Sequence, residues 1–311
     1  IAIAGSHGKT TTTSMVATIL AEAGLDPTAV IGGRLDRFGS NAKLGKSEYL
    51  VAEADESDGS FLLLTPSIAV VTNIDAEHLD HYGTMDDLQR AFQEFANKVP
   101  FYGLAILCHD HPTVQRILPS IRRRYVTYGR SVQAEIRATE IRLGAFGSEF
   151  SVNRGSESIG RVKLPIPGVH NVDNALAAVA VARELEVPFG VTAHALETFK
   201  SPARRFETKG IVAGVRIVED YGHHPAEVRA TLAAARTLEP KRIITVFQPH
   251  RFTRTQDLFG DFMSCFNESD VLVLTEIYPA GEEPIPGVTS ERLFEFFAQT
   301  PVCLDQLFTT D

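Results

Sequence analysis

The fold is decided by residues 1–12, IAIAGSHGKTTT, where a short apolar run passes through two glycines into Lys-Thr. Residues 1–4 predict a buried strand, and residues 11–23 predict a helix that ends at Gly24. Apolar side chains recur on one face of that helix, at Met15, Val16, Ile19, Leu20 and Ala23. Glycines between a strand and a helix let the backbone wrap closely round a phosphate group, and the first N–H groups of the helix point toward it. The stretch therefore predicts an α/β fold built around a phosphate-binding loop.

The loop offers a full set of phosphate contacts, namely Gly5, Ser6, His7, Gly8, Lys9, Thr10 and Thr11. Lys9 is expected to pair with the outer phosphates of a bound nucleotide, and the Thr10 hydroxyl to hold Mg²⁺. The loop departs from the common pattern GxxxxGK[ST], because the position five residues before Gly8 is Ile3 rather than glycine. An ordinary glycine-rich turn between a strand and a helix is the alternative.

Beyond the loop, short apolar runs alternate with helical patterns, which is typical of an α/β protein with a mostly parallel sheet. Strands are predicted at 49–52, 68–71 and 104–107, and helices at 85–97 and 172–185. Between residues 132 and 164 the pattern changes to short alternating segments with glycines, which predicts inserted antiparallel hairpins.

A boundary near Lys200-Ser201-Pro202 predicts two domains, residues 1–200 and residues 201–311. The second is expected to be a smaller Rossmann-like α/β domain. Its predicted strands are 211–218, 243–247, 271–274 and 302–304, and its predicted helices are 225–237, with Pro225 in the first turn, and 255–266. Because residue 1 already lies in a strand and the chain stops soon after residue 304, we expect sequence to be missing at both ends.

The composition is that of an ordinary globular protein, since 44% of the 311 residues are hydrophobic and 22% are charged. A net charge of -9 argues against a nucleic-acid surface, so no nucleic-acid partner is expected. The three cysteines are far apart in the sequence, which fits a reducing compartment and argues against a disulfide framework. No apolar run reaches membrane-spanning length, so no membrane insertion is expected.

Acidic side chains follow two of the predicted strands. Residues 49–52 run into Glu53, and residues 68–71 run into a segment that contains His78. Ligands of open α/β sheets bind outside the carboxyl ends of the strands, so both segments are expected to face the phosphate loop. Carboxylate oxygens suit Mg²⁺, and His78 is a further candidate ligand that Mn²⁺ would also accept. The alternative is that these acids are solvated or cap helices.

Further candidates lie at the starts of helices and the ends of strands. Asn171 opens a predicted helix, where a capping role is the alternative. Arg251 and Arg254 follow a strand end and suit a carboxylate, because guanidinium groups donate paired hydrogen bonds in a fixed geometry. Two histidine pairs, His223-His224 and His109 with His111, were weighed as zinc ligands. That reading is rejected, because no third ligand stands at a sensible spacing and adjacent side chains point apart.

Nine stretches together resemble the Mur ligase family, in family order and along nearly the whole chain. They are GSHGKTTT at 5–12, VIGG at 30–33, EADESDGSFL at 53–62, NIDAEHLDHYG at 73–83, GVHNVDNALAA at 168–178, RRFE at 204–207, DYGHHP at 220–225, FQPHRFTRT at 247–255 and YPAGE at 278–282. DESDGSF and FQPHRFTR favour the alanine-adding member of the family. The family has a UDP-sugar domain, a central ATPase and a C-terminal amino-acid domain, and this chain departs from it by lacking the first and part of the third.

The resemblance implies an ATP-dependent ligase of peptidoglycan precursor synthesis, located in the cytoplasm. It would join L-alanine to the lactyl carboxylate of UDP-N-acetylmuramate through an acyl phosphate, with ATP and Mg²⁺, or Mn²⁺, as cofactors. The implied ATP contacts are the loop residues 5–11 with Asn171, Arg205 and Asp220. The implied metal ligands are Thr10, Glu53 and His78, the implied substrate contacts are His223, Arg251 and Arg254, and the implied catalytic residues are Lys9, His78, Arg205 and His223.

Three alternatives stay open at this point. The sister ligase that recycles murein tripeptide shares the phosphate loop but typically differs after EADE. A phosphate-loop NTPase that acts as a switch would not need the arginines of the second domain. A nucleotide-binding fragment without catalytic activity is the third, because a substrate domain is missing.

Overall fold

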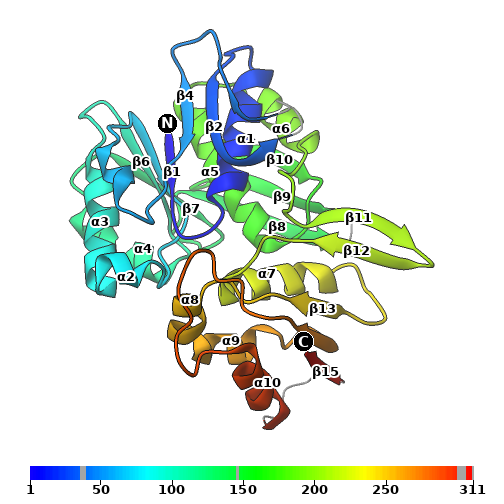
Figure 1. Ribbon diagram of the computed structural model, residues 1–311. Coiled ribbons are helices and arrows are strands. Elements are labelled where there is room, and N and C mark those ends of the chain that lie inside the picture. The colour runs from blue at the N-terminus through cyan, green and yellow to red at the C-terminus, as the bar shows by residue number, and fades with distance from the viewer. Residues whose placement is uncertain (36–39, 145–146, 300–305, 310–311) are drawn as a thin grey trace. The chain divides into compact units, whose positions relative to one another are not determined.

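A computed structural model of the protein describes residues 1–35, 40–144, 147–299 and 306–309 (Figure 1). The chain forms two compact units, Ile1–Glu207 and Thr208–Asp311. The predicted boundary at residues 200 and 201 lies shortly before this division and stays a prediction. Among the described residues, none of the helices has the length and apolar character needed to cross a bilayer.

The first unit is built on one ten-stranded sheet in the order β10-β9-β8-β7-β6-β5-β1-β4-β2-β3. The strands are β1 (Ala2–Ala4), β2 (Thr28–Leu35), β3 (Ser40–Lys43), β4 (Leu50–Glu53), β5 (Ile68–Val71), β6 (Leu104–Cys108), β7 (Tyr125–Gly129), β8 (Ile136–Gly144), β9 (Gly147–Arg154) and β10 (Glu157–Leu164). The strands from β8 through β7, β6, β5, β1 and β4 to β2 pair in parallel. Antiparallel pairs extend both edges, with β3 on one side and β9 and β10 on the other. The predicted fold class and the inserted hairpins are thus confirmed.

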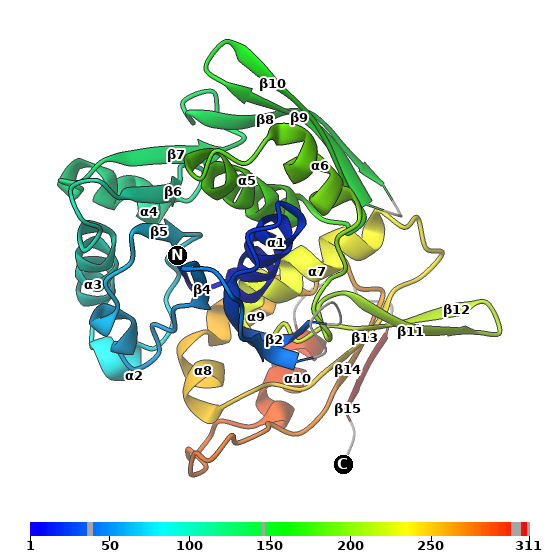
Figure 2. The same ribbon diagram turned by 90° about the horizontal axis from the view of Figure 1, so that it is seen from above.

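Helices cover both faces of this sheet (Figures 1 and 2). They are α1 (Lys9–Glu22), α2 (Leu79–Tyr82), α3 (Met85–Asn97), α4 (Pro112–Ile117), α5 (Val169–Glu184) and α6 (Phe189–Glu197). The side chains of the central strands alternate between the two faces, as strand geometry requires. Large ones such as Ile3, Val70 and Ile106 pack against α1, α5 and α6, while small ones such as Ala69 and Ala105 pack against α3 and α4.

Helix α1 is buried on every side rather than on one face. All residues from Thr10 to Leu20 are buried, because α1 packs against the sheet and also contacts α5 and α6. The predicted apolar face packs in the core, and the other positions of the helix, several of them threonines, are buried as well. The predicted end is confirmed, since Gly24 adopts a left-handed φ of 76° just after the last turn.

The second unit holds a parallel three-stranded sheet of β13 (Ile244–Phe247), β14 (Val271–Leu274) and β15 (Gln306–Thr309). Its core joins β13 and β14 to helices α7 (Pro225–Arg236), α9 (Phe259–Cys265) and α10 (Ser290–Gln299). Pro225 occupies the first turn of α7, as predicted. The predicted strand 302–304 lies outside the described residues.

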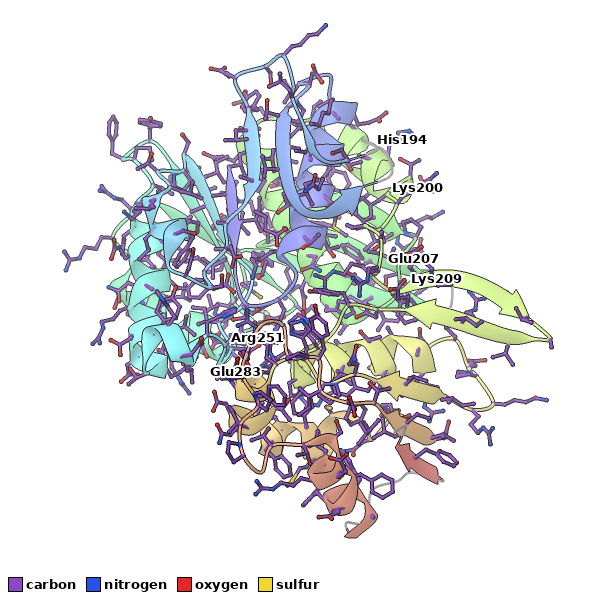
Figure 3. All side chains as sticks on the ribbon, viewed as in Figure 1. His194, Lys200, Glu207, Lys209, Arg251 and Glu283 are labelled. Carbon is purple, nitrogen blue, oxygen red and sulfur yellow. The ribbon has the colours of Figure 1, made fainter. Side chains whose placement is uncertain are left out.

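Two elements predicted as continuous in this unit are wrong. Residues 211–218 do not form one strand, because Ala213 and Gly214 turn with φ of 50° and 81° and divide β11 (Glu207–Val212) from β12 (Val215–Glu219). Lys209 on β11 forms an ion pair with Glu219 on β12 at 3.2 Å (Figure 3). Residues 255–266 do not form one helix either, because Leu258 leaves helical geometry to enter the core and separates α8 (Phe252–Asp257) from α9.

Candidate functional site

The phosphate-loop candidate lies where three parallel strands end together. It connects β1 to α1, and β4 and β5 pair with β1 on either side, with Ile3 opposite Glu53 and Ala4 opposite Val71. The sheet register therefore places both acidic segments beside the loop. The first N–H groups of α1 have no acceptor within the helix, as at every helix start, so they can bind an anion.

Two glycines are required by the tight surroundings of the loop. Gly5 has a φ of 133°, and a Cβ atom there would lie 2.0 Å from Oγ1 of Thr72. Gly8 has a φ of 82°, and a Cβ atom there would lie 2.5 Å from Oδ1 of Asn174. Any side chain at either position would force the loop away from β5 or from α5.

Lys9 forms a buried ion pair at the centre of the loop. Its Nζ lies 2.8 Å from Oε1 of Glu56 and donates to the carbonyl of Gly5 at 2.7 Å. Burial alone would lower the pKa of Lys9, but Glu56 outweighs this effect and raises the pKa. Burial raises the pKa of Glu56 while the ammonium group lowers it, and the 2.8 Å contact is that of a charged hydrogen bond, so we take both groups as ionised.

Thr10 and Glu53, two of the predicted metal ligands, are brought together. Oγ1 of Thr10 donates to Oε1 of Glu53 at 3.1 Å, and Oε2 of Glu53 accepts from the N–H of Gly32 at 2.8 Å. A Cβ atom on Gly32 would lie 2.7 Å from Oε2 of Glu53, so the glycine allows the approach. The pair offers two hard oxygen ligands directly at the start of α1.

His78, the third predicted ligand, is grouped with two acids that the sequence analysis did not select. Ligand atoms of Glu56, Glu77 and His78 all lie within 4.8 Å of one another. Glu56 is fully buried, and its Oε2 makes no hydrogen bond, so this oxygen is available to a cation. Glu56 could have been found from the sequence, because it follows the same strand as Glu53. The donor set of two carboxylates and one imidazole fits Mg²⁺ or Mn²⁺.

The predicted adenine contact, Asn171, lies in the first turn of α5, and the suggested capping role is wrong because Gly168 occupies the N-cap position. Its amide donates to the carbonyl of Pro167 at 2.7 Å. Its Oδ1 accepts from Asn174 at 3.3 Å, and Oδ1 of Asn174 accepts from Thr12 on α1 at 3.2 Å. The sequence analysis missed Asn174, although a spacing of three residues puts it on the same helix face as Asn171.

Arg205 lies between α6 and β11 in a backbone of unusual shape. Its neighbours Arg204 and Phe206 have φ of 60° and 49°, and the carbonyl of Arg205 accepts from Ser201 at 3.0 Å. Pro202 lies beside Gly33, where an added Cβ would be 3.8 Å from Pro202 and 3.2 Å from Thr10. The segment that carries Arg205 therefore begins close to the Thr10 side of the loop.

In the second unit, the remaining candidates lie on the loops before α7 and α8. Asp220 accepts from the N–H of Gly222 at 2.7 Å, and Nδ1 of His223 lies 3.0 Å from the carbonyl of Tyr221. The rings of His223 and His250 are 5.3 Å apart between centroids. The loop before α7 is thus joined to the loop before α8.

The two candidate arginines lie at the start of α8, with Arg251 at its N-cap and Arg254 inside the helix. Arg251, labelled in Figure 3, has a φ of 72° and lies 3.9 Å from Glu282. Nη1 of Arg254 lies 3.3 Å from Nδ1 of His250 and 3.2 Å from its carbonyl. Burial, His223 and the two arginines lower the pKa of His250 to about 4, so this imidazole is neutral at pH 7. The structure brings His223 and Arg254 together around His250, which was not among the predicted site residues.

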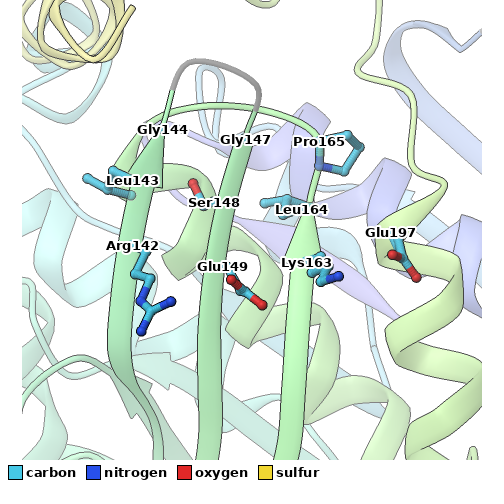
Figure 4. Close-up of a pocket in the computed structure, with 10 residues that line it drawn as sticks. All are labelled: Arg142, Leu143, Gly144, Gly147, Ser148, Glu149, Lys163, Leu164, Pro165 and Glu197. Atoms are coloured by element: carbon cyan, nitrogen blue, oxygen red, sulfur yellow. The ribbon is translucent and has the colours of Figure 1, made fainter.

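An open groove of about 460 Å³ is found elsewhere in the first unit, on the hairpin strands β8, β9 and β10 and the end of α6 (Figure 4). Arg142 and Lys163 line it together with Glu149 and Glu197. None of its lining residues belongs to the predicted site, and its mixed charges favour no ligand class.

Two family models match the chain. The Mur ligase middle domain matches residues 3–182, and the domain described as Mur ligase, glutamate ligase domain matches residues 204–306. Among curated proteins, the UDP-N-acetylmuramate–L-alanine ligase of Anaeromyxobacter dehalogenans strain 2CP-C is 59% identical over 295 residues, which are 95% of this chain and 64% of the relative. The ligase of the same name from Sorangium cellulosum is 59% identical over 95% of this chain and 64% of its own length. The chain thus spans somewhat less than two thirds of these relatives.

Solved structures of Mur ligases have a similar fold. A UDP-N-acetylmuramate–alanine ligase from Thermotoga maritima has a TM-score of 0.79 at 25% identity, and the match covers 99% of this chain and 70% of that one. A murein peptide ligase from Psychrobacter arcticus has a TM-score of 0.69 at 25% identity, covering 100% and 69%.

Proposed function

The chain belongs to the Mur ligase family, and from this premise we propose that it is the ATP- and amino-acid-binding part of a UDP-N-acetylmuramate–L-alanine ligase. The observation that carries the proposal is the loop of residues 5–10, with partly buried Lys9 and buried Thr10 facing the acids at the ends of β4 and β5. The two relatives reported above bear the name of this ligase at 59% identity. We propose ATP as the nucleotide and UDP-N-acetylmuramate and L-alanine as the substrates.

In the first step, the lactyl carboxylate would attack the γ-phosphorus of ATP. A new O–P bond forms while the bond to the β,γ-bridging oxygen breaks, which yields an acyl phosphate and ADP. Such transfer depends mainly on positioning and charge neutralisation. Lys9 would leave Glu56 and pair with the outer phosphates instead. The N–H groups at the start of α1 would donate hydrogen bonds to the same phosphates. Arg205 would neutralise charge on the transferred phosphoryl group.

In the second step, the amine of alanine would attack the acyl carbon. The tetrahedral intermediate collapses, the C–O bond to phosphate breaks, and the nitrogen loses a proton, leaving an amide and inorganic phosphate. Arg251 and Arg254 would hold the alanine carboxylate, and His223 would orient the amine. Asn171 and Asp220 are proposed to contact the adenine and the ribose of the nucleotide.

Two divalent cation positions fit the donor sets of the first unit. Thr10 with Glu53 would hold one Mg²⁺, and His78 with Glu56 and Glu77 would hold a second. When bound, Mg²⁺ would neutralise the phosphate oxygens and orient the reacting groups. Mn²⁺ is the alternative ion, because His78 supplies a nitrogen ligand.

A reconstituted ligation assay tests the proposal. The chain is supplied with the UDP-sugar domain of a relative, and ADP release is measured with UDP-N-acetylmuramate and each amino acid in turn. We expect release that requires both the sugar nucleotide and L-alanine, together with a product of the corresponding mass. Release without any acceptor would instead indicate a simple ATPase, and a preference for murein tripeptide over alanine would indicate the recycling ligase. A chain that binds Mg·ATP but ligates nothing even with the added domain would contradict the ligase function.

A further inference from the structure

His111 forms part of a chain of side chains that ends on the phosphate loop. It stands just before α4, far from the loop in sequence, and its Nε2 lies 3.2 Å from Oδ1 of Asp75. The other carboxylate oxygen of Asp75 lies 3.2 Å from Nε2 of His7, inside the loop. The two oxygens of the Asp75 carboxylate thus lie beside two different imidazole rings.

The tautomer of His111 follows from its second contact. Its Nδ1 lies 3.4 Å from the backbone N–H of Ile74, and this nitrogen has to accept because the backbone group can only donate. The proton of the neutral ring is therefore on Nε2, which donates to Asp75. Both ring nitrogens of His111 are used, Nδ1 by Ile74 and Nε2 by Asp75. The ring therefore fixes the orientation of the Asp75 carboxylate.

Asp75 restrains the loop at two residues. Its backbone N–H donates to Oγ of Ser6 at 2.9 Å, and its carboxylate reaches the ring of His7. The backbone of His7 is held independently, since its N–H donates to Oδ1 of Asn73 at 2.7 Å and its carbonyl accepts from Thr72 at 2.6 Å. The side chain of His7 therefore has its own anchor, and that anchor depends on where Asp75 points.

We propose that His111 is a positioning residue for the phosphate loop, which acts by holding Asp75 in the orientation that restrains the side chain of His7. The inference rests on the proposed function of this loop in binding ATP. A loop that is already in its binding geometry loses less conformational freedom when the nucleotide arrives. The role differs from that of a metal ligand, since His111 acts through Asp75 and not on the nucleotide.

The experiment compares three variants in the full chain. His111→Leu removes the donor and keeps bulk, and His111→Gln restores an N–H donor at similar reach. His109→Leu is the matched control, because His109 stands two residues away and its Nδ1 lies 3.5 Å from Nε2 of Gln115, outside the chain of side chains that leads to His7. Backbone hydrogen exchange of residues 5–9 is measured without nucleotide, the Kd for Mg·ATP is measured by calorimetry, and imidazole ¹⁵N spectra report the tautomers.

We expect His111→Leu to speed exchange in residues 5–9 and to raise the Kd for Mg·ATP about tenfold, the effect of one lost hydrogen bond to a charged group. His111→Gln should recover most of both effects, and His109→Leu should change neither. The proposal is overturned if exchange in the loop is unchanged in His111→Leu, or if exchange rises uniformly over the whole first unit. If the unmodified chain binds no ATP while the loop still responds to His111→Leu, the positioning role stands and the proposed function fails.

Discussion

At the residue scale, the contact between Arg254 and His250 determines which hydrogen-bond donors the second unit can offer to a ligand. An arginine can only donate, so Nδ1 of His250 accepts from Arg254 and the ring proton lies on Nε2. The loop therefore presents two cationic guanidinium groups and one neutral N–H donor, a set that suits a small carboxylate.

Replacing Arg254 by alanine tests this assignment. We expect the alanine KM of the reconstituted ligase to rise at least about tenfold, because a charge-assisted hydrogen bond contributes on the order of 1.5–3 kcal/mol. The ATP KM should move much less. Arg229→Ala is the matched control, since Arg229 lies on α7 and donates to Ser264 at 3.2 Å, outside the candidate amino-acid site. Equal shifts in both KM values, or none, would show that the second unit is not the amino-acid site.

The pair of Lys9 and Glu56 gives a prediction about stability as well as binding. Lys9→Met leaves a fully buried carboxylate without its cation, so we expect the free energy of unfolding to fall by about 3 kcal/mol. Adding Glu56→Gln should recover most of that loss, while Mg·ATP binding stays abolished in both variants. Urea denaturation and calorimetry measure the two quantities. If Lys9→Met unfolds at the same urea concentration as the unmodified chain, the pair is not the buried charged contact described here.

At the element scale, the start of α5 carries a partly buried acid, Asp173. Asp173 accepts from Arg130 at 3.1 Å, and Arg130 also lies 3.2 Å from Asp110. Burial raises the pKa of Asp173 to about 7, although Arg130 acts in the opposite direction. The helix that carries Asn171 and Asn174 is therefore anchored by a carboxyl group that titrates near neutral pH.

The sign of this titration sets a pH dependence. The folded chain keeps the Asp173 proton up to about pH 7, whereas the unfolded chain loses it near its usual pKa of 3.8. The native state thus binds more protons between these values, and its stability falls as the pH rises through that window. Asp173→Asn should flatten this decline and raise the free energy of unfolding at pH 8 by at least about 1.4 kcal/mol, the equivalent of one pKa unit. A variant that is destabilised equally at pH 4 and pH 8 would show that Asp173 is ionised throughout.

The elements that the sequence predicted well are those with a strong local pattern. The predicted strand 68–71 matches β5 and the predicted helix 85–97 matches α3, because an apolar run and a 3.6-residue period respectively mark them. Residues 5–8 connect a strand to a helix as predicted, while their role in phosphate binding stays a prediction. The prediction of one strand over residues 211–218 was wrong because Ala213 adopts a positive φ that the local sequence pattern does not indicate. The grouping of Glu56, Glu77 and His78, and the chain from His111 to His7, could not be predicted, since strand register and not sequence distance brings them together.

At the scale of the whole molecule, the two classes of candidate residue divide between the two units. The phosphate loop, both candidate metal positions and the asparagines of α5 lie in Ile1–Glu207, while the candidate amino-acid contacts lie in Thr208–Asp311. Asp220 is the one proposed nucleotide contact that belongs to the second unit. Each unit has its own buried core. Nucleotide binding and amino-acid binding should therefore be separable.

A fragment of residues 1–207 tests that separation. We expect it to unfold cooperatively and to bind Mg·ATP at least about tenfold more weakly than the full chain, the effect of losing one hydrogen bond from the nucleotide to the Asp220 carboxylate. Asp220→Ala in the full chain should show the same loss. Calorimetry measures both affinities. A folded fragment without affinity for ATP, beside an Asp220→Ala chain with normal affinity, would show that other residues of the second unit hold the nucleotide.

The contact between Lys9 and Glu56 also makes the loop selective before any ligand meets it. The carboxylate of Glu56 competes with any bound anion for the ammonium group of Lys9. Because both groups belong to the same chain, the effective concentration of Glu56 at Lys9 is set by the fold and does not fall on dilution. Every anion that enters the loop has to displace it. Free phosphate would have few other contacts with which to offset that displacement, whereas Mg·ATP bound as proposed would also offer Glu56 a cation and reach α5. We therefore expect Glu56 to exclude small anions more strongly than it excludes the nucleotide.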